Sequence, residues 1–168
     1  MPPALRRLTA LGRVPALQHG DFWLTESLAI VEYLEEIFPP PHYPPLFPAD
    51  PRGRARTRQI LAYLRADLRA LRDERPWRLT IWPASPPPLS ATATRDARAL
   101  LEFVEHLQTT GELATWSIAH ADIAFTLQRL IQTDHTLTDA VRRFYEITVA
   151  RPSVRAYLEH PRPPNPPP

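Results

Sequence analysis

The apolar residues between Gly12 and Pro39 follow two periods in succession. Residues 16–18 and 22–24 alternate on either side of a glycine-containing turn at residues 19–21, which is typical of a β-hairpin. From Ser27 the period becomes helical, and the prolines at 39–41 end the helix because they lack backbone donors. One helix face is apolar and should be buried, and the other is acidic and should face water: Ile30, Val31, Leu34, Ile37 and Phe38 against Glu32, Glu35 and Glu36.

Beyond residue 50 the pattern predicts helices almost throughout. A long first helix is expected over residues 51–73, with Asp50 as its N-cap and Pro51 as its first residue. Residues 78–89 contain IWPASPPPL and should form a loop, because prolines interrupt any regular element. Further helices are expected over residues 90–108, 116–132, 138–150 and 153–160.

The predicted helix over residues 116–132 is apolar nearly all round, so we expect it to lie at the centre of a helical domain. The two helices after it should contribute buried residues to the same core: Val141, Phe144, Tyr145 and Ile147, and then Val154, Tyr157 and Leu158.

These elements give a mainly α chain with two unequal parts. A short α/β part, the hairpin and one helix, occupies residues 1–39, and an all-α domain occupies residues 51–160. The proline-rich segment 40–50 is the expected linker, and the tail 161–168, PRPPNPPP, is expected to be disordered.

Composition excludes several classes of protein. The chain has no cysteine, so it can supply no disulfide, thiolate nucleophile or cysteine-ligated metal. No apolar run approaches the length of a membrane span or of a signal-peptide core, so we expect a cytoplasmic protein without membrane contact. The sequence has no glycine-rich phosphate loop and no HExxH motif, and we expect no metal.

All 20 basic residues are arginine, yet the formal net charge is only +2. Five of them form a stripe along the first long helix: Arg54, Arg58, Arg65, Arg69 and Arg72. Acidic residues interrupt this stripe and no aromatic residues alternate with it, which argues against nucleic-acid binding. A helix surface that faces solvent or another subunit is the favoured interpretation.

Glu26 and Ser27 at the start of the first helix are suited to binding the free end of an amino acid, which presents an ammonium beside a carboxylate. The Glu26 carboxylate can face the ammonium. The Ser27 hydroxyl and the unpaired first-turn amides can hold the carboxylate at the positive end of the helix dipole. The alternative is that Thr25 or Ser27 is only an N-cap.

The segments GRVPAL, ESLAIVEYLEE and FP together resemble the second half of the thioredoxin-like domain of glutathione transferases. The resemblance implies that Val14 presents its backbone to the cysteinyl part of glutathione and that Pro15 is cis. It implies that Glu26 and Ser27 hold the γ-glutamyl end and that Arg13 faces the glycine carboxylate. Glutathione would be the co-substrate, a hydrophobic electrophile the second ligand, and a homodimer the assembly.

The same resemblance places the first long helix beside the acceptor pocket, where Asp67, Arg72 and Arg75 are candidates for substrate contact. In the family the central helix opens with a capping box whose acid is replaced here by His120. A histidine should close this box less well, so His120→Asp is expected to stabilise the protein. Asp122 is expected to accept hydrogen bonds from backbone amides, and His120 to be structural.

The resemblance covers residues 12–160 and lacks the strand, helix and strand with which the family's first domain opens. Relatives carry the thiol-activating Tyr, Ser or Cys there, so we expect no catalytic residue in this chain, weak glutathione binding and little activity from it alone. Three readings stay open: a glutathione transferase, a noncatalytic binding or assembly module, and an inactive truncated product. A maleylacetoacetate isomerase is the alternative reaction.

Overall fold

In the computed structural model, the described residues are 9, 11–12, 14–82, 85–132 and 136–164. The hairpin consists of β1 (Ala16–His19) and β2 (Phe22–Thr25), which pair antiparallel with Ala16 opposite Thr25 and His19 opposite Phe22. Gly20 has φ +63, the left-handed conformation that a two-residue hairpin turn requires and that glycine adopts without a Cβ clash. The predicted hairpin is therefore confirmed, with one more residue in each strand.

The helix α2 (Ser27–Ile37) follows the hairpin as expected, but its faces differ from the prediction. Glu35 was placed on the water face and is buried, with 8% of its surface exposed, whereas Ile37 and Phe38 are exposed. The reason is that Glu35 has two partners outside its own helix. Its carboxylate accepts from the Leu46 amide at 2.8 Å and from the Arg54 guanidinium at 3.2 Å.

The long helix expected over residues 51–73 is broken into α3 (Pro51–Ala66) and α4 (Arg69–Glu74). The break lies at Leu68, which has φ +56 and yet is buried in the core. Asp96, on the later helix α5 (Ala91–Thr109), accepts from the Leu71 amide at 3.1 Å and so satisfies a first-turn donor of α4. The sequence between Asp67 and Arg69 has no glycine or proline to reveal this turn.

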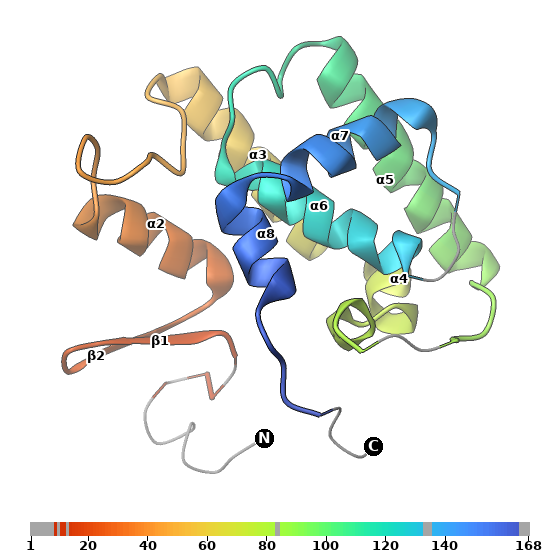
Figure 1. Cartoon of the computed structure of the whole chain (residues 1–168), viewed down its shortest axis with the longest axis horizontal. Helices are drawn as coiled ribbons and strands as arrows, with labels where there is room; N and C mark the ends of the chain where they lie inside the picture. Colours follow the sequence, from red (N-terminus) through yellow and green to blue (C-terminus); the bar gives the residue numbers. More distant parts are fainter. Residues whose placement is uncertain (1–8, 10, 13, 83–84, 133–135, 165–168) are drawn as a thin grey trace.

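The remaining helices form the all-α domain (Figure 1), with α6 crossing its middle. They are α5 (Ala91–Thr109), α6 (Ile118–Ile131), α7 (Asp139–Val149) and α8 (Pro152–Glu159), and a 3₁₀ turn, η1 (Trp77–Thr80), lies within the predicted loop region. Ile123, Leu127 and Leu130 of α6 are fully buried. The prediction that Ile147 and Tyr157 belong to the core is wrong, since both are exposed. No helix in the described part of the chain is long and apolar enough to cross a bilayer.

Three arginines of α3 reach partners on other helices, which corrects the expected solvent- or subunit-facing stripe. Arg54 bonds Glu35 and Arg58 bonds Glu32, both on α2, while Arg65 bonds Ser27 at the start of α2. We call Arg54, Arg58 and Arg65 the α3 arginine row. Figure 1 shows α2 and the hairpin beside the helical domain, and this row is the polar connection between the two.

The linker joins α2 to the core of the helical domain. Leu46 donates its amide to Glu35, and its carbonyl accepts from the Ile118 amide at 2.7 Å, at the first residue of α6. Phe47 is 1% exposed and packs in the core, and the guanidinium groups of Arg54 and Arg58 lie over its ring. Two members of the α3 arginine row, Arg54 and Arg58, therefore lie on a buried aromatic ring of the linker.

His120 closes the capping box of α6 and does more than the sequence suggested. Its Nδ1 accepts from the Ser117 amide at 3.2 Å, and its Nε2 lies 3.1 Å from the Leu113 carbonyl. The ring also stacks between Trp116 and Phe144. The expected gain from His120→Asp loses its basis, because the aspartate would keep only the box and would lose the other contacts.

We predict that Glu35→Ala lowers the free energy of unfolding by about 2–3 kcal/mol, because it leaves the Leu46 amide and the Arg54 guanidinium without their buried acceptor. Glu36 is its exposed neighbour on the same helix, so Glu36→Ala should change stability by no more than about 0.5 kcal/mol. Urea unfolding of both variants measures the difference. Equal losses would show that Glu35 does not join α2 to the linker.

We also predict that stability falls as the pH drops below about 6.5, the ordinary value for histidine. Burial lowers the pKa of His120, so the unfolded chain takes up a proton more readily than the folded one. The contribution of neutral His120 to the free energy of unfolding is fully present above the pKa of the histidine in the unfolded chain. It is lost as the pH falls through the lower pKa of His120 in the folded protein. Urea unfolding at several pH values between 7.5 and 5.5 measures how the free energy of unfolding falls with pH. The fall should be smaller in His120→Asn than in the parent and should be the same as in the parent in His106→Asn.

Candidate functional site

The site begins where the chain enters the hairpin. The Val14–Pro15 peptide bond is cis, as predicted. Val14 is 71% exposed, and within the described part of the chain its backbone makes no hydrogen bond, so its N–H and C=O are open to a peptide-like ligand. Arg13, the candidate for the glycine carboxylate, lies outside the described residues.

Glu26 has a backbone conformation that L-residues rarely adopt. Its φ is 72 and its ψ is 112, and it directly precedes α2 as the N-cap. Such a conformation costs on the order of 1–3 kcal/mol in a non-glycine residue and recurs at ligand-binding positions. The Glu26 side chain is exposed and makes no capping bond, so its carboxylate is open to a ligand.

Ser27 is the first residue of α2, which makes the interpretation as a simple N-cap wrong. The side chain of the N-cap residue Glu26 does not cap this helix, so in the described part of the chain first-turn amides such as those of Ser27 and Leu28 have no cap acceptor. The Ser27 hydroxyl oxygen accepts from Arg65 Nε at 2.9 Å. Its own proton is thereby directed toward another acceptor, and the arginine adds positive charge beside the helix dipole.

Arg65 also bonds Asp122, which overturns the expectation that Asp122 accepts from backbone amides. The Arg65 Nη1 and Asp122 Oδ2 atoms lie 2.5 Å apart and join α3 to α6. Burial raises the pKa of the Asp122 carboxyl above its ordinary value, while the charge and hydrogen bond of Arg65 oppose that rise. Arg65 is therefore held from one side by Asp122 while it orients Ser27 on the other.

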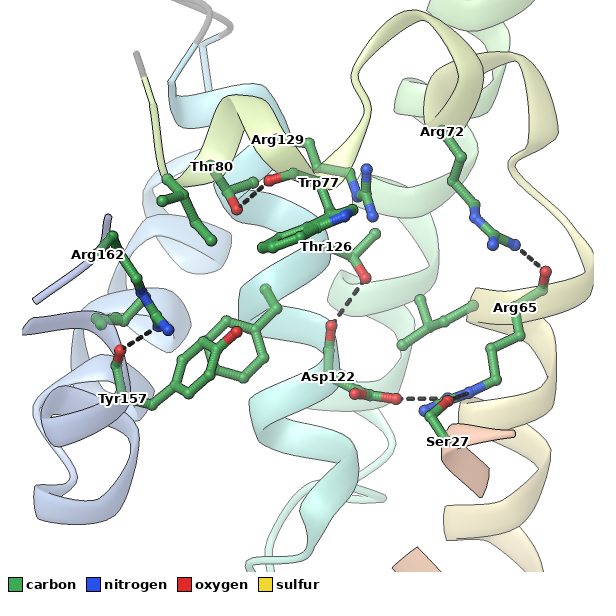
Figure 2. A pocket seen from close by; sticks show the side chains of 14 residues that line it. Ser27, Arg65, Arg72, Trp77, Thr80, Asp122, Thr126, Arg129, Tyr157 and Arg162 are labelled. Atoms are coloured by element: carbon green, nitrogen blue, oxygen red, sulfur yellow. Dashed lines mark hydrogen bonds and ion pairs between the residues drawn. The ribbon is translucent and has the colours of Figure 1, made fainter. Parts of the chain in front are cut away.

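A cavity of about 300 Å³ opens beside Ser27. Its wall combines aromatic and aliphatic side chains from η1, α6 and α8 with arginines from four segments (Figure 2). The apolar lining residues are Leu64, Trp77, Ile81, Phe125, Tyr157 and Leu158, and the arginines are Arg65, Arg72, Arg129 and Arg162. The cavity can therefore receive a ligand that is partly aromatic or apolar.

Two family models match almost the whole chain. The model of the glutathione S-transferase C-terminal domain matches residues 50–160, and that of the N-terminal domain matches residues 1–42. The chain belongs to the glutathione S-transferase family.

Known members of the family support the assignment. Human glutathione S-transferase theta-1 is 35% identical over 127 residues, which are 71% of this chain and 52% of that protein. The maleylacetoacetate isomerase of Pseudomonas aeruginosa is 44% identical over 73 residues, 42% of this chain and 32% of that protein. The matched part of the chain thus spans about half the length of the human relative and about a third of the length of the bacterial one.

A solved structure gives the same fold. A glutathione transferase homologue from Burkholderia, crystallised with bound glutathione, is 34% identical and superposes with a TM-score of 0.72. The match covers 94% of this chain and 77% of the Burkholderia one. The arrangement of a partial thioredoxin-like part and an all-α domain is therefore that of a glutathione S-transferase.

The three acceptor candidates of this glutathione S-transferase lie in different places. Arg72 lines the cavity. The Arg75 side chain is buried at 3% exposure and donates to the Glu74 and Pro87 carbonyls, so it fixes the segment between η1 and α5. Asp67 is exposed, caps the end of α3 and is not among the residues that line the cavity.

Sequence reasoning did not select Arg65, Arg129, Trp77 or Tyr157 as site residues, although all line the cavity. Arg65 and Asp122 are 57 positions apart, and no local pattern marks them as a pair. The one available signal was Asp122, the single carboxylate in the mainly apolar sequence of α6, since a buried carboxylate there needs a cationic partner. In the described residues, no group of three or more His, Asp or Glu side chains is placed to hold a metal ion.

We predict that Glu26→Gly makes this protein more stable and that the loss of the exposed carboxylate weakens any binding of glutathione at the start of α2. Glycine adopts positive φ without the Cβ penalty, so the free energy of unfolding should rise by about 1 kcal/mol. Glu26→Ala loses the same carboxylate and keeps the strained backbone, so it should weaken binding without the gain. Thermal unfolding and glutathione titration of both variants separate the two effects, and a more stable Glu26→Ala would contradict the role of strain.

Proposed function

We propose that this chain is the glutathione- and acceptor-binding part of a glutathione transferase. In the substitution reaction, the thiolate sulfur of glutathione attacks an electrophilic carbon of the acceptor. A C–S bond forms as the bond to the leaving group breaks, the leaving group departs with its electron pair, and the thiol proton passes to solvent. The observation that carries the proposal is Ser27, which Arg65 orients at the edge of the cavity.

Ser27 and the start of α2 would bind the γ-glutamyl carboxylate. The Ser27 oxygen already accepts from Arg65, so its hydroxyl donates to the carboxylate. The uncapped first-turn amides donate as well, at the positive end of the helix dipole. Glu26 would face the γ-glutamyl ammonium, and the Val14 backbone would bond the cysteinyl unit as an added strand does.

The cavity would bind the acceptor. Trp77, Phe125 and Tyr157 give it aromatic surface, and Arg72 is a polar contact at its rim. The cavity shares Ser27 with the glutathione site, so the acceptor would lie beside the bound glutathione. Arg75 would act indirectly, because its side chain holds the segment that follows η1.

We further propose that the protein acts in the cytoplasm as a homodimer. Val14, Phe22, Phe38 and Tyr43 expose large apolar surface on and beside the hairpin and α2. Phe38 and Tyr43 pack edge to face against each other, which gives this surface a firm aromatic patch. Exposed apolar patches of this kind are typical of surfaces that bind another subunit.

A maleylacetoacetate-isomerase-type reaction is the second candidate. It is favoured by the 44% identity with the Pseudomonas aeruginosa enzyme over 73 residues. Both candidates use the same glutathione site, so glutathione binding tests what they share and turnover of a chlorodinitrobenzene or of a cis-dienoic acid distinguishes them. Glutathione binding without either turnover would favour a noncatalytic binding module.

The test is glutathione titration by calorimetry on the parent chain and on Ser27→Ala. A hydrogen bond to a charged group contributes about 1.5–3 kcal/mol, so Ser27→Ala should raise the dissociation constant roughly tenfold or more. Ser153 is a matched control, because it is an exposed serine in the first turn of α8 that lines none of the described cavities. Ser153→Ala should bind as the parent does, and an unchanged constant in Ser27→Ala would reject the proposed site.

A further inference from the structure

A short proline-containing segment after α8, residues 160–163, runs along the cavity to a tryptophan on another side of it. The chain leaves α8 at His160 with φ −58 and ψ 126, which is close to the polyproline II conformation. Arg162 then lines the cavity, and the Pro163 carbonyl accepts from the Trp82 indole N–H at 3.0 Å. We call residues 160–163 the proline strap.

The proline strap joins two walls of the cavity. Tyr157 and Leu158 line the cavity from α8, while Trp77 and Ile81 line it from η1 and the residue after it. Trp82 directly follows Ile81, and the centre of its ring lies 6.4 Å from that of Trp77. The bond from Trp82 to the strap therefore ties the end of α8 to the η1 side of the cavity, across 81 positions of sequence.

Arg162 is the strap residue that lines the cavity. Its guanidinium carbon lies 4.4 Å from the centre of the Tyr157 ring, and its Nη2 donates to the Tyr157 carbonyl at 2.7 Å. Tyr157 in turn packs edge to face on Phe125 of α6. Figure 2 shows Arg162 and Tyr157 at one end of the cavity and Ser27 at the other. The strap therefore forms the end wall of the cavity that is remote from Ser27.

Few contacts hold the strap in the described part of the chain. Among the residues of α8, all of which the structure describes, only Val154 is buried. The prolines at 161 and 163 have no N–H with which the strap could bond the helical domain. A neutral hydrogen bond and a cation–π contact each shift an equilibrium by about fivefold. Two such contacts leave an open arrangement populated at on the order of a few per cent.

We propose that the proline strap limits the length of the acceptor. The cavity of about 300 Å³ is at the lower end of the range for small-molecule pockets, about 300–1,000 Å³. An acceptor with short apolar substituents packs against Tyr157 and Phe125 while the strap stays closed. A longer acceptor has to displace Arg162 and break the bond from Trp82 to Pro163.

Trp82 and Arg162 are thus positioning residues, which select short acceptors by holding the strap in place. This inference rests on the proposed function only in taking the cavity as the acceptor site. It predicts a dependence on ligand length that a purely structural role of the two residues would not produce.

The test measures how affinity grows along the 4-n-alkylphenols, from ethyl to hexyl, by calorimetry on the full chain without glutathione. Each buried CH₂ group tightens binding by about fourfold, and in the parent this gain should stop once the alkyl chain reaches the strap. Trp82→Phe keeps an aromatic ring and loses the N–H donor. Because the strap then opens more easily, hexylphenol should bind this variant about fivefold more tightly than the parent, while ethylphenol binds both equally.

Arg162→Gln is the second variant, because it removes the contact with the Tyr157 ring and should give the same pattern. Arg162 belongs to no helix, so this variant should melt with the parent, and thermal unfolding checks both variants. Trp23→Phe and Arg155→Gln are the matched controls, since Trp23 of β2 and the exposed Arg155 of α8 line none of the described cavities. Both controls should bind the whole series as the parent does.

Four results would overturn the proposal. In the parent, a gain that continues unbroken to hexylphenol would show that the strap closes nothing, and an absence of binding at millimolar concentration would show that the cavity takes no apolar acceptor. In the two variants, equal changes for both phenols would indicate a general loosening of the cavity. No change for either phenol in both variants would show that Trp82 and Arg162 do not hold the strap.

Glutathione titration of the same samples separates this inference from the proposed function. A parent that binds glutathione but shows no limit on alkyl length would reject the strap alone. A parent that shows the limit, with the limit relieved in the two variants, but fails to bind glutathione would support the strap and reject the glutathione site.

Discussion

The contact of α2 with α3 is the interaction on which the rest of the site depends. The hairpin and α2 contribute little to the main core, in which Leu28 and Val31 are only partly buried. Three arginines of α3 compensate for this by reaching across to Glu35, Glu32 and Ser27. Their order along α3 is the reverse of their partners' order along α2, which fixes how one helix lies against the other.

The three contacts of the arginine row differ in what they do. The Arg58–Glu32 pair is bidentate but nearly half exposed on the arginine side, so solvent screens it and it adds little stability. Glu35 is buried and also bonds the linker, so its contact stabilises the joint between the two parts. Arg65 orients a site residue instead, because it sets the direction of the Ser27 hydroxyl and is itself held by Asp122.

The site combines strain, open donors and charge within a short distance. Glu26 keeps an unfavourable backbone, its side chain does not cap the start of α2, and among the described residues of the cavity wall there are more guanidinium groups than carboxylates. Each of these features costs stability in the absence of a ligand. A ligand whose carboxylate binds at the start of α2 would offset part of these costs, which is consistent with a site that is formed before it is filled.

The sequence by itself determined the local elements of this protein. Four local signals act through neighbouring residues, and each was found where it was expected. They are the change of period after the hairpin, the prolines after α2, the Asp50–Pro51 start of α3 and the apolar centre of α6. The segments that resemble the family also drew attention to Glu26 and Ser27, which the structure has at the start of α2. Local periodicity and turn chemistry contain this information because they depend on residues a few positions apart.

Only the tertiary structure decided which polar residues are partners. The sequence placed Glu35 on the water face of α2, but Leu46 and Arg54 donate to its buried carboxylate. It placed Ile147 in the core, but Ile147 is exposed. The turn at Leu68 is imposed by the core and by Asp96 rather than by a glycine. The Arg65–Asp122 pair joins two helices that are far apart in the sequence, and the arginines that line the cavity also come from distant segments. A periodic pattern shows which face of a helix is apolar, but the partner of a long charged side chain depends on which helix lies within its reach.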